Sequence, residues 1–398
     1  MYSRPSYLTI SLVSLFVSSS NSQALSKNLF SNDVVNSYGS RCLDGSPAGY
    51  FYAAGQGSGS NSYVIFLEGG GFCADPISCA ARANTSLGSS KFWPSTTEGY
   101  GIIDASPVNN PNFYNFNRIY VLYCSGDVHA GTRNTTVDPI LFPFYFSGHR
   151  IVTAVIDALL NTTNIANADT VILAGSSAGG LGTFTNADFV KYRLGTNVKQ
   201  FLANPQGGWF FPLVVNYTAF QNNQLGPPYA GESPLFTALF QPFVNEKCAQ
   251  AHNVTYCQTV NNAYPYIETP LFIAENAADS NQIFSENGCP EKNNPQVVAY
   301  INYYIQNMRS SLQQVFNSNN KKPINDGIFL PTCLAHTENT NVGSNTTINH
   351  VSVTAALGSW FLQNNQVPTR LEDACTGIDC NPSCPPLPFE KPKYPIGI

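Results

Sequence analysis

The sequence predicts an α/β fold in which a mostly parallel central sheet is covered by helices on both faces. Three observations lead to this prediction. Short, continuous apolar runs alternate along the chain with segments of helical spacing, as is typical of strands buried in a parallel sheet. Residues 170–192 combine one such run with a Gly/Ser turn and a helical segment. Eleven cysteines, beginning at Cys42, indicate that disulfides cross-link the fold.

The individual elements follow from these patterns. Strand candidates lie at residues 63–67, 118–123, 170–174, 270–274 and 327–330. Helix candidates lie at residues 151–160, 181–192, 297–315 and 351–362. No internal repeat and no Pro/Gly-rich linker interrupts the chain before its Cys/Pro-rich end. We therefore expect one catalytic domain over residues 23–374 and a C-terminal tail over residues 375–398.

The N-terminal segment has the parts of a secretory signal, which we assign to residues 1–22. One early cation, Arg4, precedes an apolar run over residues 8–17, and small polar residues follow. An uncleaved membrane anchor is the alternative, but about ten apolar residues are too few to span roughly 30 Å of hydrocarbon. We expect a secreted, extracellular protein without stable membrane insertion, and the cell wall is one place where it would act.

Charged residues are scarce. They make up 11% of the 398 residues, and the net charge is -5, whereas a typical soluble domain has roughly 25%. This balance argues against a nucleic-acid binder, which is marked by a basic patch. Aromatic residues reach 13%, so the chain can bury enough surface to fold. The surface must therefore be polar but mostly uncharged.

Cysteines and sequons both fit secretion. The cysteines predict disulfides rather than a metal site, because no paired CxxC or HExxH spacing occurs. Their odd number leaves at least one thiol free or paired elsewhere. Six sequons are candidates for N-glycosylation, at Asn84, Asn134, Asn161, Asn216, Asn253 and Asn345. Glycans would help to keep so weakly charged a surface in solution.

The turn at residues 175–179 reads Gly-Ser-Ser-Ala-Gly and matches the G-x-S-x-G pattern of a serine nucleophile. A strand candidate precedes it and a helix candidate follows, which is the context that the pattern requires. The central residue, Ser177, is the predicted nucleophile. The alternative is a tight strand-to-helix connection in which Ser176 and Ser177 only cap the helix.

A nucleophilic serine needs a base and a group that orients the base. Of the histidines after Ser177, His252 resembles a surface-loop residue and His350 opens the last helix candidate, whereas His336 follows a strand candidate. Among the later acids, Asp279 follows the strand candidate at 270–274. Position alone therefore favours Ser177, Asp279 and His336 as a triad.

Donors for an oxyanion are expected after the first strand. Consecutive glycines at residues 69–71 allow bare backbone N–H groups to approach a developing negative charge. We assign donors to Gly70 and Gly71, and a third to Ala178, which follows the nucleophile. A phosphate loop is the alternative, but it needs a Lys-Ser/Thr pair where this chain has Phe72-Cys73.

Several stretches resemble the pectin acetylesterase family, which includes the animal carboxylesterase Notum. In chain order they are LEGGGFC, NPNFYNFNRIYVLYCSGD, AGSSAGG, PLFIAENAADSNQI and CLAH. The resemblance implies an α/β-hydrolase fold and a secreted serine esterase without a metal or cofactor, with the triad at Ser177, Asp279 and His336. Together with proximity in the sequence, it also implies the disulfides Cys42–Cys124, Cys73–Cys79 and Cys248–Cys257.

The chain departs from the family near the expected pocket. Residues 204–211 read NPQGGWFF where relatives usually have an Asp-small-Gly-aromatic-Phe stretch, and Asn281 and Phe72 stand where Trp is common. The substrate therefore does not follow from the resemblance alone. The abundant Tyr, Asn and Gln favour an acetylated, pectin-like polysaccharide, hydrolysed through an acyl-enzyme. The alternatives are a lipid acyl ester on a protein and a catalytically silent binding module. We expect a monomer.

Overall fold

The structure is a computed structural model that describes residues 23–212, 215–224, 234–292, 294–318, 322–378 and 380–387. The predicted signal at residues 1–22 lies outside the described residues, as does the end of the predicted tail beyond residue 387.

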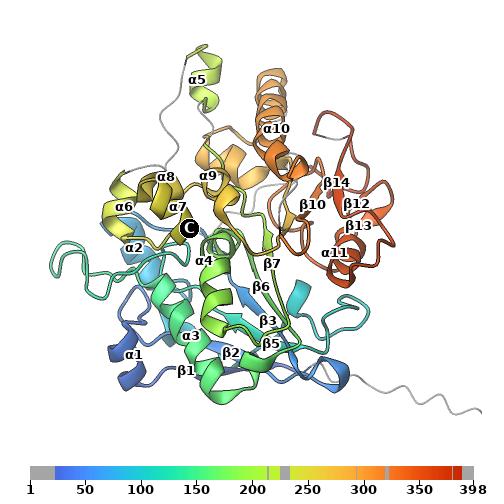
Figure 1. Cartoon of the computed structure of the whole chain (residues 1–398). Helices are drawn as coiled ribbons and strands as arrows, with labels where there is room; N and C mark the ends of the chain where they lie inside the picture. Colours follow the sequence, from blue (N-terminus) through green and yellow to red (C-terminus); the bar gives the residue numbers. More distant parts are fainter. Residues whose placement is uncertain are drawn as a thin grey trace, which may run out of the picture.

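A ten-stranded sheet forms the centre of the molecule, with the order β14-β10-β8-β7-β6-β3-β5-β2-β1-β4 (Figure 1). Neighbours from β14 to β5 are parallel, and β2, β1 and β4 extend the sheet with antiparallel pairing. The strands are β1 (Leu25–Leu29), β2 (Gly49–Ala53), β3 (Ser62–Leu67), β4 (Thr96–Thr97), β5 (Asn117–Val121), β6 (Thr170–Ser176), β7 (Gln200–Gln206), β8 (Phe272–Ala274), β10 (Gly327–Leu330) and β14 (Arg370–Glu372).

Two small sheets lie apart from the large one. A parallel pair joins β9 (Ala278–Asp279) to β11 (Leu334–Ala335), and a hairpin joins β12 (Thr347–Ile348) to β13 (Val351–Ser352). The parallel pair continues past the carboxyl ends of β8 and β10, which precede its two strands in the chain.

The described helices are α1 (Asn32–Tyr38), α2 (Pro76–Ala83), α3 (Gly148–Thr162), α4 (Ala178–Leu194), α5 (Tyr217–Gln221), α6 (Pro234–Phe240), α7 (Glu246–Ala251), α8 (Val254–Cys257), α9 (Val260–Ala263), α10 (Pro295–Phe316) and α11 (Val353–Leu362), together with the π-helical turn η7 (Asn281–Glu286). Short 3-10 turns lie at Gly57–Gly59, Ser90–Phe92, Gly101–Ile103, Ile165–Asn167 and Tyr264–Tyr266. No described helix is both long and apolar enough to cross a bilayer.

Helices cover both faces of the sheet, as β10 shows. Successive strand residues point to opposite faces, and Ile328 packs in the same apolar cluster as α10, whereas Phe329 packs in the cluster that contains α11. Figure 1 shows α3 and α4 lying across the sheet, and α4 packs on β6 and β7. The predicted fold class is confirmed.

Each predicted strand and helix overlaps an observed element, but one central strand went unpredicted. β7 has the sequence QFLANPQ and lacks a continuous apolar run. Its polar end is satisfied inside the protein: Asn204 Nδ2 donates to the Phe272 carbonyl at 2.7 Å, and Gln206 Nε2 donates to Asn204 Oδ1 at 2.7 Å. At the last predicted helix, α11 begins only at Val353, because residues 351–352 pair in the hairpin.

Five disulfides cross-link the described chain: Cys42–Cys124, Cys73–Cys79, Cys248–Cys257, Cys333–Cys384 and Cys375–Cys380. The first three are the pairs expected from the sequence, and the other two bind the Cys-rich tail to itself and to the catalytic domain. Cys289 is free and buried.

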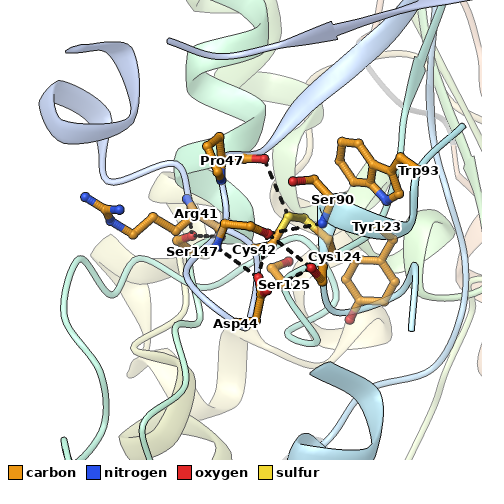
Figure 2. Close-up of a disulfide and its surroundings, with 12 residues drawn as sticks. Arg41, Cys42, Asp44, Pro47, Ser90, Trp93, Tyr123, Cys124, Ser125 and Ser147 are labelled. Atoms are coloured by element: carbon orange, nitrogen blue, oxygen red, sulfur yellow. Dashed lines mark hydrogen bonds between the residues drawn. A yellow bond between two sulfur atoms is a disulfide. The ribbon is translucent and has the colours of Figure 1, made fainter. Parts of the chain in front are cut away.

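The Cys42–Cys124 disulfide fastens the N-terminal segment to the end of β5 (Figure 2). Main-chain and side-chain bonds surround it: Leu43 N donates to the Cys124 carbonyl at 2.7 Å, and the Ser147 hydroxyl donates to the Arg41 carbonyl at 2.6 Å. Tyr123, which precedes Cys124, is fully buried. The cross-link therefore fixes β5 at its carboxyl end.

Candidate active site

Ser177 lies in the sharp turn between β6 and α4. Its φ of 56° and ψ of -121° are a backbone conformation that residues other than glycine rarely adopt. The flanking glycines are required by close approach, since a Cβ at Gly175 would lie 2.3 Å from the Gly179 carbonyl oxygen, and one at Gly179 would lie 2.0 Å from that of Leu67. Such a turn presents the serine hydroxyl at the carboxyl edge of the sheet.

The structure brings His336 and Asp279 to this hydroxyl. The small parallel pair aligns Ala335 with Asp279, so the next residue, His336, leaves β11 beside the carboxyl group. His336 Nε2 lies 2.8 Å from Ser177 Oγ, and His336 Nδ1 lies 2.6 Å from Asp279 Oδ2. The other carboxylate oxygen, Asp279 Oδ1, accepts the Gln282 N–H at 2.8 Å. We call Asp279 and His336 the acid–base pair.

The surroundings of the pair favour a charged imidazole. The Asp279 side chain is fully buried and that of His336 is 16% exposed. Burial lowers the pKa of His336, but the negative charge of Asp279 and its hydrogen bond outweigh this effect, so that the net pKa is raised. An imidazole held in this way can accept the serine proton and remain stable as the imidazolium.

The three expected oxyanion donors lie at the same edge. β3 and β6 are parallel neighbours in which Leu67 is aligned with Gly175, so the segment after β3 leaves the sheet beside Ser177. We call residues 68–73 the donor loop. Gly70 and Gly71 have φ of 136° and 66°. Within the described part of the chain, the N–H groups of Gly70, Gly71 and Ala178 form no hydrogen bond.

Arg82, at the end of α2, holds the donor loop. Its Nη1 donates to the Gly70 carbonyl at 2.7 Å and its Nε donates to the Leu87 carbonyl at 3.0 Å. The guanidinium also lies 4.8 Å from the ring centroid of Tyr123. The Cys73–Cys79 disulfide ties the end of the loop to the same helix. A cation and a covalent bond therefore fix the glycines from the α2 side.

With this geometry in view, comparison with known proteins identifies the family. A sequence profile described as Pectinacetylesterase matches residues 19–385. The chain is a member of the pectinacetylesterase family. Pectin acetylesterase 4 of Arabidopsis thaliana is 29% identical over 384 residues, covering 87% of this chain and 85% of that protein. The palmitoleoyl-protein carboxylesterase notum1a of Danio rerio is 30% identical over 379 residues, covering 87% of this chain and 70% of that protein.

Solved structures agree with this placement. The structure of the Wnt deacylase Notum from Drosophila matches with a TM-score of 0.77 and 27% identity, over 91% of this chain and 100% of that one. Both kinds of relative are carboxylic ester hydrolases. This pectinacetylesterase-family protein is therefore a carboxylic ester hydrolase, and the polymer or protein on which it acts is taken up below.

The other histidine and acid candidates lie outside the site. His252 and His350 are exposed, and His350 stands in the turn of the β12–β13 hairpin rather than at the start of the last helix. Asp188, within α4, accepts hydrogen bonds from the main chain of Glu268 and Thr269. Asp188 therefore fixes the segment before β8 and takes no part in the site.

The sequence departures take different places in this pectinacetylesterase-family fold. Trp209 is fully buried and donates its indole N–H to Ser311 Oγ at 2.9 Å, so it belongs to the core and not to the pocket. Phe210 lies with its ring 6.1 Å from that of His336. Phe72 is 43% exposed, and its ring lies 5.0 Å from that of Phe236 in α6. Asn281 begins the turn η7, two residues after Asp279.

The predicted sequons stand mostly at the surface. Asn216 is half-buried and caps α5, and the other five are exposed: Asn84, Asn134, Asn161, Asn253 and Asn345. Within the described ranges, no group of three or more His, Cys, Asp or Glu side chains is arranged to hold a metal ion.

Sequence reasoning missed two residues that support the site, Arg82 and Glu275. Nothing in the sequence around Arg82 distinguishes it from a solvated helix cation. Glu275 carried a usable signal, because it is an ionisable residue directly after the strand β8, and the carboxyl ends of parallel strands meet at one edge.

Proposed function

We propose that this protein is a secreted serine esterase that removes acetyl groups from an acetylated, pectin-like polysaccharide. The observation that carries the chemistry is the hydrogen-bonded order Ser177–His336–Asp279, with distances of 2.8 and 2.6 Å, beside open N–H donors. The family match over residues 19–385 supports the substrate class.

The reaction would proceed through an acyl-enzyme. Ser177 Oγ attacks the ester carbonyl carbon while His336 Nε2 takes the hydroxyl proton. Asp279 holds the tautomer with the proton on Nδ1 and stabilises the imidazolium. The N–H groups of Gly70, Gly71 and Ala178 bind the oxyanion of the tetrahedral intermediate. His336 then protonates the leaving sugar oxygen, and water repeats the sequence to release acetate.

Ser177→Ala tests the chemistry. It should lower the turnover of a nitrophenyl acetate by about 10⁴-fold or more, and a fluorophosphonate probe should label the native protein at Ser177 but not the variant. Ser176→Ala is the matched control, because its neighbouring hydroxyl makes no contact with His336 in the described structure. Equal turnover in Ser177→Ala and the native protein would contradict the proposal, and an unlabelled native protein would favour the binding-module alternative.

Removal of a lipid acyl chain from a protein is the second candidate. Similarity to the Notum carboxylesterases favours it, as does an exposed aromatic residue of the donor loop, Phe72, which is 43% exposed and whose ring packs against that of Phe236 in α6. Acetate release from acetylated pectin, compared with acetylated xylan and a lipidated peptide, separates the two. Nitrophenyl acetate and octanoate provide the matched pair of small substrates: a sharp fall with chain length supports deacetylation, and a rise supports lipid removal.

The location and assembly belong to the same proposal. A signal over residues 1–22, a catalytic domain over residues 23–374, glycans on the exposed sequons and a monomeric state would suit an extracellular enzyme. Disulfides joining distant segments, such as Cys42–Cys124, support an oxidising compartment.

A further inference from the structure

A second carboxyl group, that of Glu275, lies behind the acid–base pair. Glu275 is the first residue after β8 and is fully buried, as is Asp279. Its Oε2 accepts the Trp209 N–H at 2.7 Å and its Oε1 accepts the Asn276 N–H at 3.0 Å. The next residue, Asn276, donates through its Nδ2 to the His336 carbonyl at 2.5 Å, which places this segment beside the acid–base pair, and a side-chain hydrogen bond with Asp279 contributes to raising the pKa of Glu275.

No cation compensates these two carboxyl groups. Among the described residues, the partners of Asp279 are His336 and the Gln282 N–H, and no lysine or arginine bonds to either acid. The other titratable groups that face the cluster add no positive charge: they are Tyr304 from α10, Glu286 from η7 and, next to His336, Glu338. Two ionised carboxylates in such a buried place would repel each other at high cost.

We propose that Glu275 is a positioning residue that is protonated and donates its O–H to Asp279, so that the two carboxyl groups carry one negative charge between them. Asp279 then accepts three donors: the Glu275 O–H, the Gln282 N–H and the His336 Nδ1–H. A carboxylate has room for all three. Burial and the charge of Asp279 both raise the pKa of Glu275, which agrees with this assignment.

The shared proton would set both the orientation and the strength of the base. It gives Asp279 a further hydrogen-bond donor without a lysine or an arginine, so the imidazolium formed during turnover faces a single negative charge. A doubly charged cluster would stabilise the imidazolium further and would slow its return of the proton to the leaving group. This inference rests on the proposed serine mechanism, but its first test does not require turnover.

The first test is infrared difference spectroscopy of the full protein against Glu275→Gln at about pH 7, well above the usual pKa of a glutamate. The native protein should show the carbonyl band of a protonated carboxylic acid that the variant lacks. Glu246→Gln, which changes an exposed glutamate of α7, should leave that band in place. Absence of a Glu275-dependent band overturns the proposal, even if the protein proves to have no esterase activity.

The second test is the acidic limb of the pH profile for kcat/KM with nitrophenyl acetate, which reports the pKa of His336. In Glu275→Gln the neutral amide still donates a hydrogen bond to Asp279, so the acidic limb should stay at the same pH. The amide has one oxygen fewer to accept the two backbone N–H groups, and kcat/KM should therefore stay within about tenfold of the native value. Glu275→Leu removes the donor, so that the negative charge of Asp279 acts undiminished on His336, and should move the acidic limb to higher pH.

The outcomes separate the proposal from a purely structural role. If Glu275 were ionised in the native protein, Glu275→Gln would remove a negative charge and lower the limb by about one pH unit, which overturns the proposal. If the acidic limbs of Glu275→Gln and Glu275→Leu lie at the same pH, Glu275 does not act as a hydrogen-bond donor to Asp279. If Glu275→Leu does not fold, the infrared band and the pH profile of Glu275→Gln still show whether Glu275 is protonated. A native protein without turnover contradicts the proposed function instead.

Discussion

The donor loop and the acid–base pair approach Ser177 from the two sides of β6 in the sheet. On one side, β3 delivers Gly70 and Gly71, which are exposed, and whose positions depend on Arg82 and on the Cys73–Cys79 disulfide. On the other side, β7 and β8 lead toward Asp279, which is fully buried and held by hydrogen bonds from the protein interior.

The difference follows from what each side must supply. In the proposed mechanism the backbone donors contact the substrate directly, so their loop cannot be buried and has to be held by contacts of its own. The proposed acid does not contact the substrate, and burial therefore strengthens its effect on the imidazole. We expect changes on the buried side to alter the chemistry most, and changes on the exposed side to act through the position of the donors.

Of the changes on the two sides of β6, Asp279→Asn should lower turnover most. The amide keeps the shape but favours the wrong imidazole tautomer and removes the negative charge that raises the pKa of His336. Turnover of nitrophenyl acetate should fall by about 10⁴-fold. Asp188→Asn, which alters a buried acid of α4 remote from His336, serves as the control. A loss in Asp279→Asn of less than about tenfold would remove Asp279 from the triad.

Gly70→Ala should have the next largest effect. The φ of 136° disfavours a side chain, and the new Cβ would lie 2.8 Å from Leu87 Cδ2, so that the loop is strained and either it or the Leu87 side chain must shift. Loss of one oxyanion donor lowers kcat by about 10²- to 10³-fold. Gly57→Ala is the control, because Gly57 also has a positive φ but has open space around its Cβ. An equal kcat loss in both variants would mean that strain, and not donor position, is responsible.

Arg82→Met should have a smaller effect, because the disulfide still holds the loop. We expect kcat to fall by about tenfold, which corresponds to roughly 1.4 kcal/mol in the barrier, with little change in KM. Arg370→Met is matched, since Arg370 also donates to main-chain carbonyls, those of Asp326, Phe316 and Ser318, but from β14 at the far edge of the sheet. If replacing both Cys73 and Cys79 lowers kcat more than Arg82→Met does, the disulfide contributes more than Arg82 to holding the donor loop.

The smallest effect is expected from Glu338→Gln. Glu338 is exposed and its charge contributes to raising the pKa of His336. Without that charge the pKa of His336 falls, so the neutral imidazole persists to lower pH. The acidic limb of the kcat/KM profile should therefore move to lower pH by about 0.3 pH units. At high ionic strength the native and variant profiles should converge. A shift to higher pH would contradict the sign of this interaction.

The extent of sequence prediction also differs between the two sides. The Gly-Ser-Ser-Ala-Gly turn and the glycines after 63–67 predicted the turns that carry the proposed nucleophile and donors, because both depend on local backbone geometry that small residues reveal. Position and family resemblance predicted Asp279 and His336. The strand β7 was not predicted, because Asn204 and Gln206 interrupt its apolar pattern. The hydrogen bonds that satisfy these two side chains, to the Phe272 carbonyl and to each other, form only in the folded sheet.

Arg82 and Glu275, which support the site, were not predicted, because their roles depend on residues distant in the sequence or on burial. Arg82 bonds to Gly70, 12 residues earlier, across a loop whose path the sequence does not give. The significance of Glu275 depends on its burial beside Asp279 without a cation, and burial of a single carboxyl group is a property of the packed structure. The pairing of Cys333 with Cys384 was likewise invisible, because 51 residues separate them.

That pairing has a consequence for when the enzyme first becomes competent during its synthesis. Cys333 lies three residues before His336, and its partner, Cys384, is synthesised only after α11 and β14. Until Cys384 arrives and is oxidised, the segment that carries the histidine lacks its covalent anchor, although Ser177 and the donor loop are already present. During synthesis Ser177 is therefore made well before the covalent anchor of the His336 segment can close.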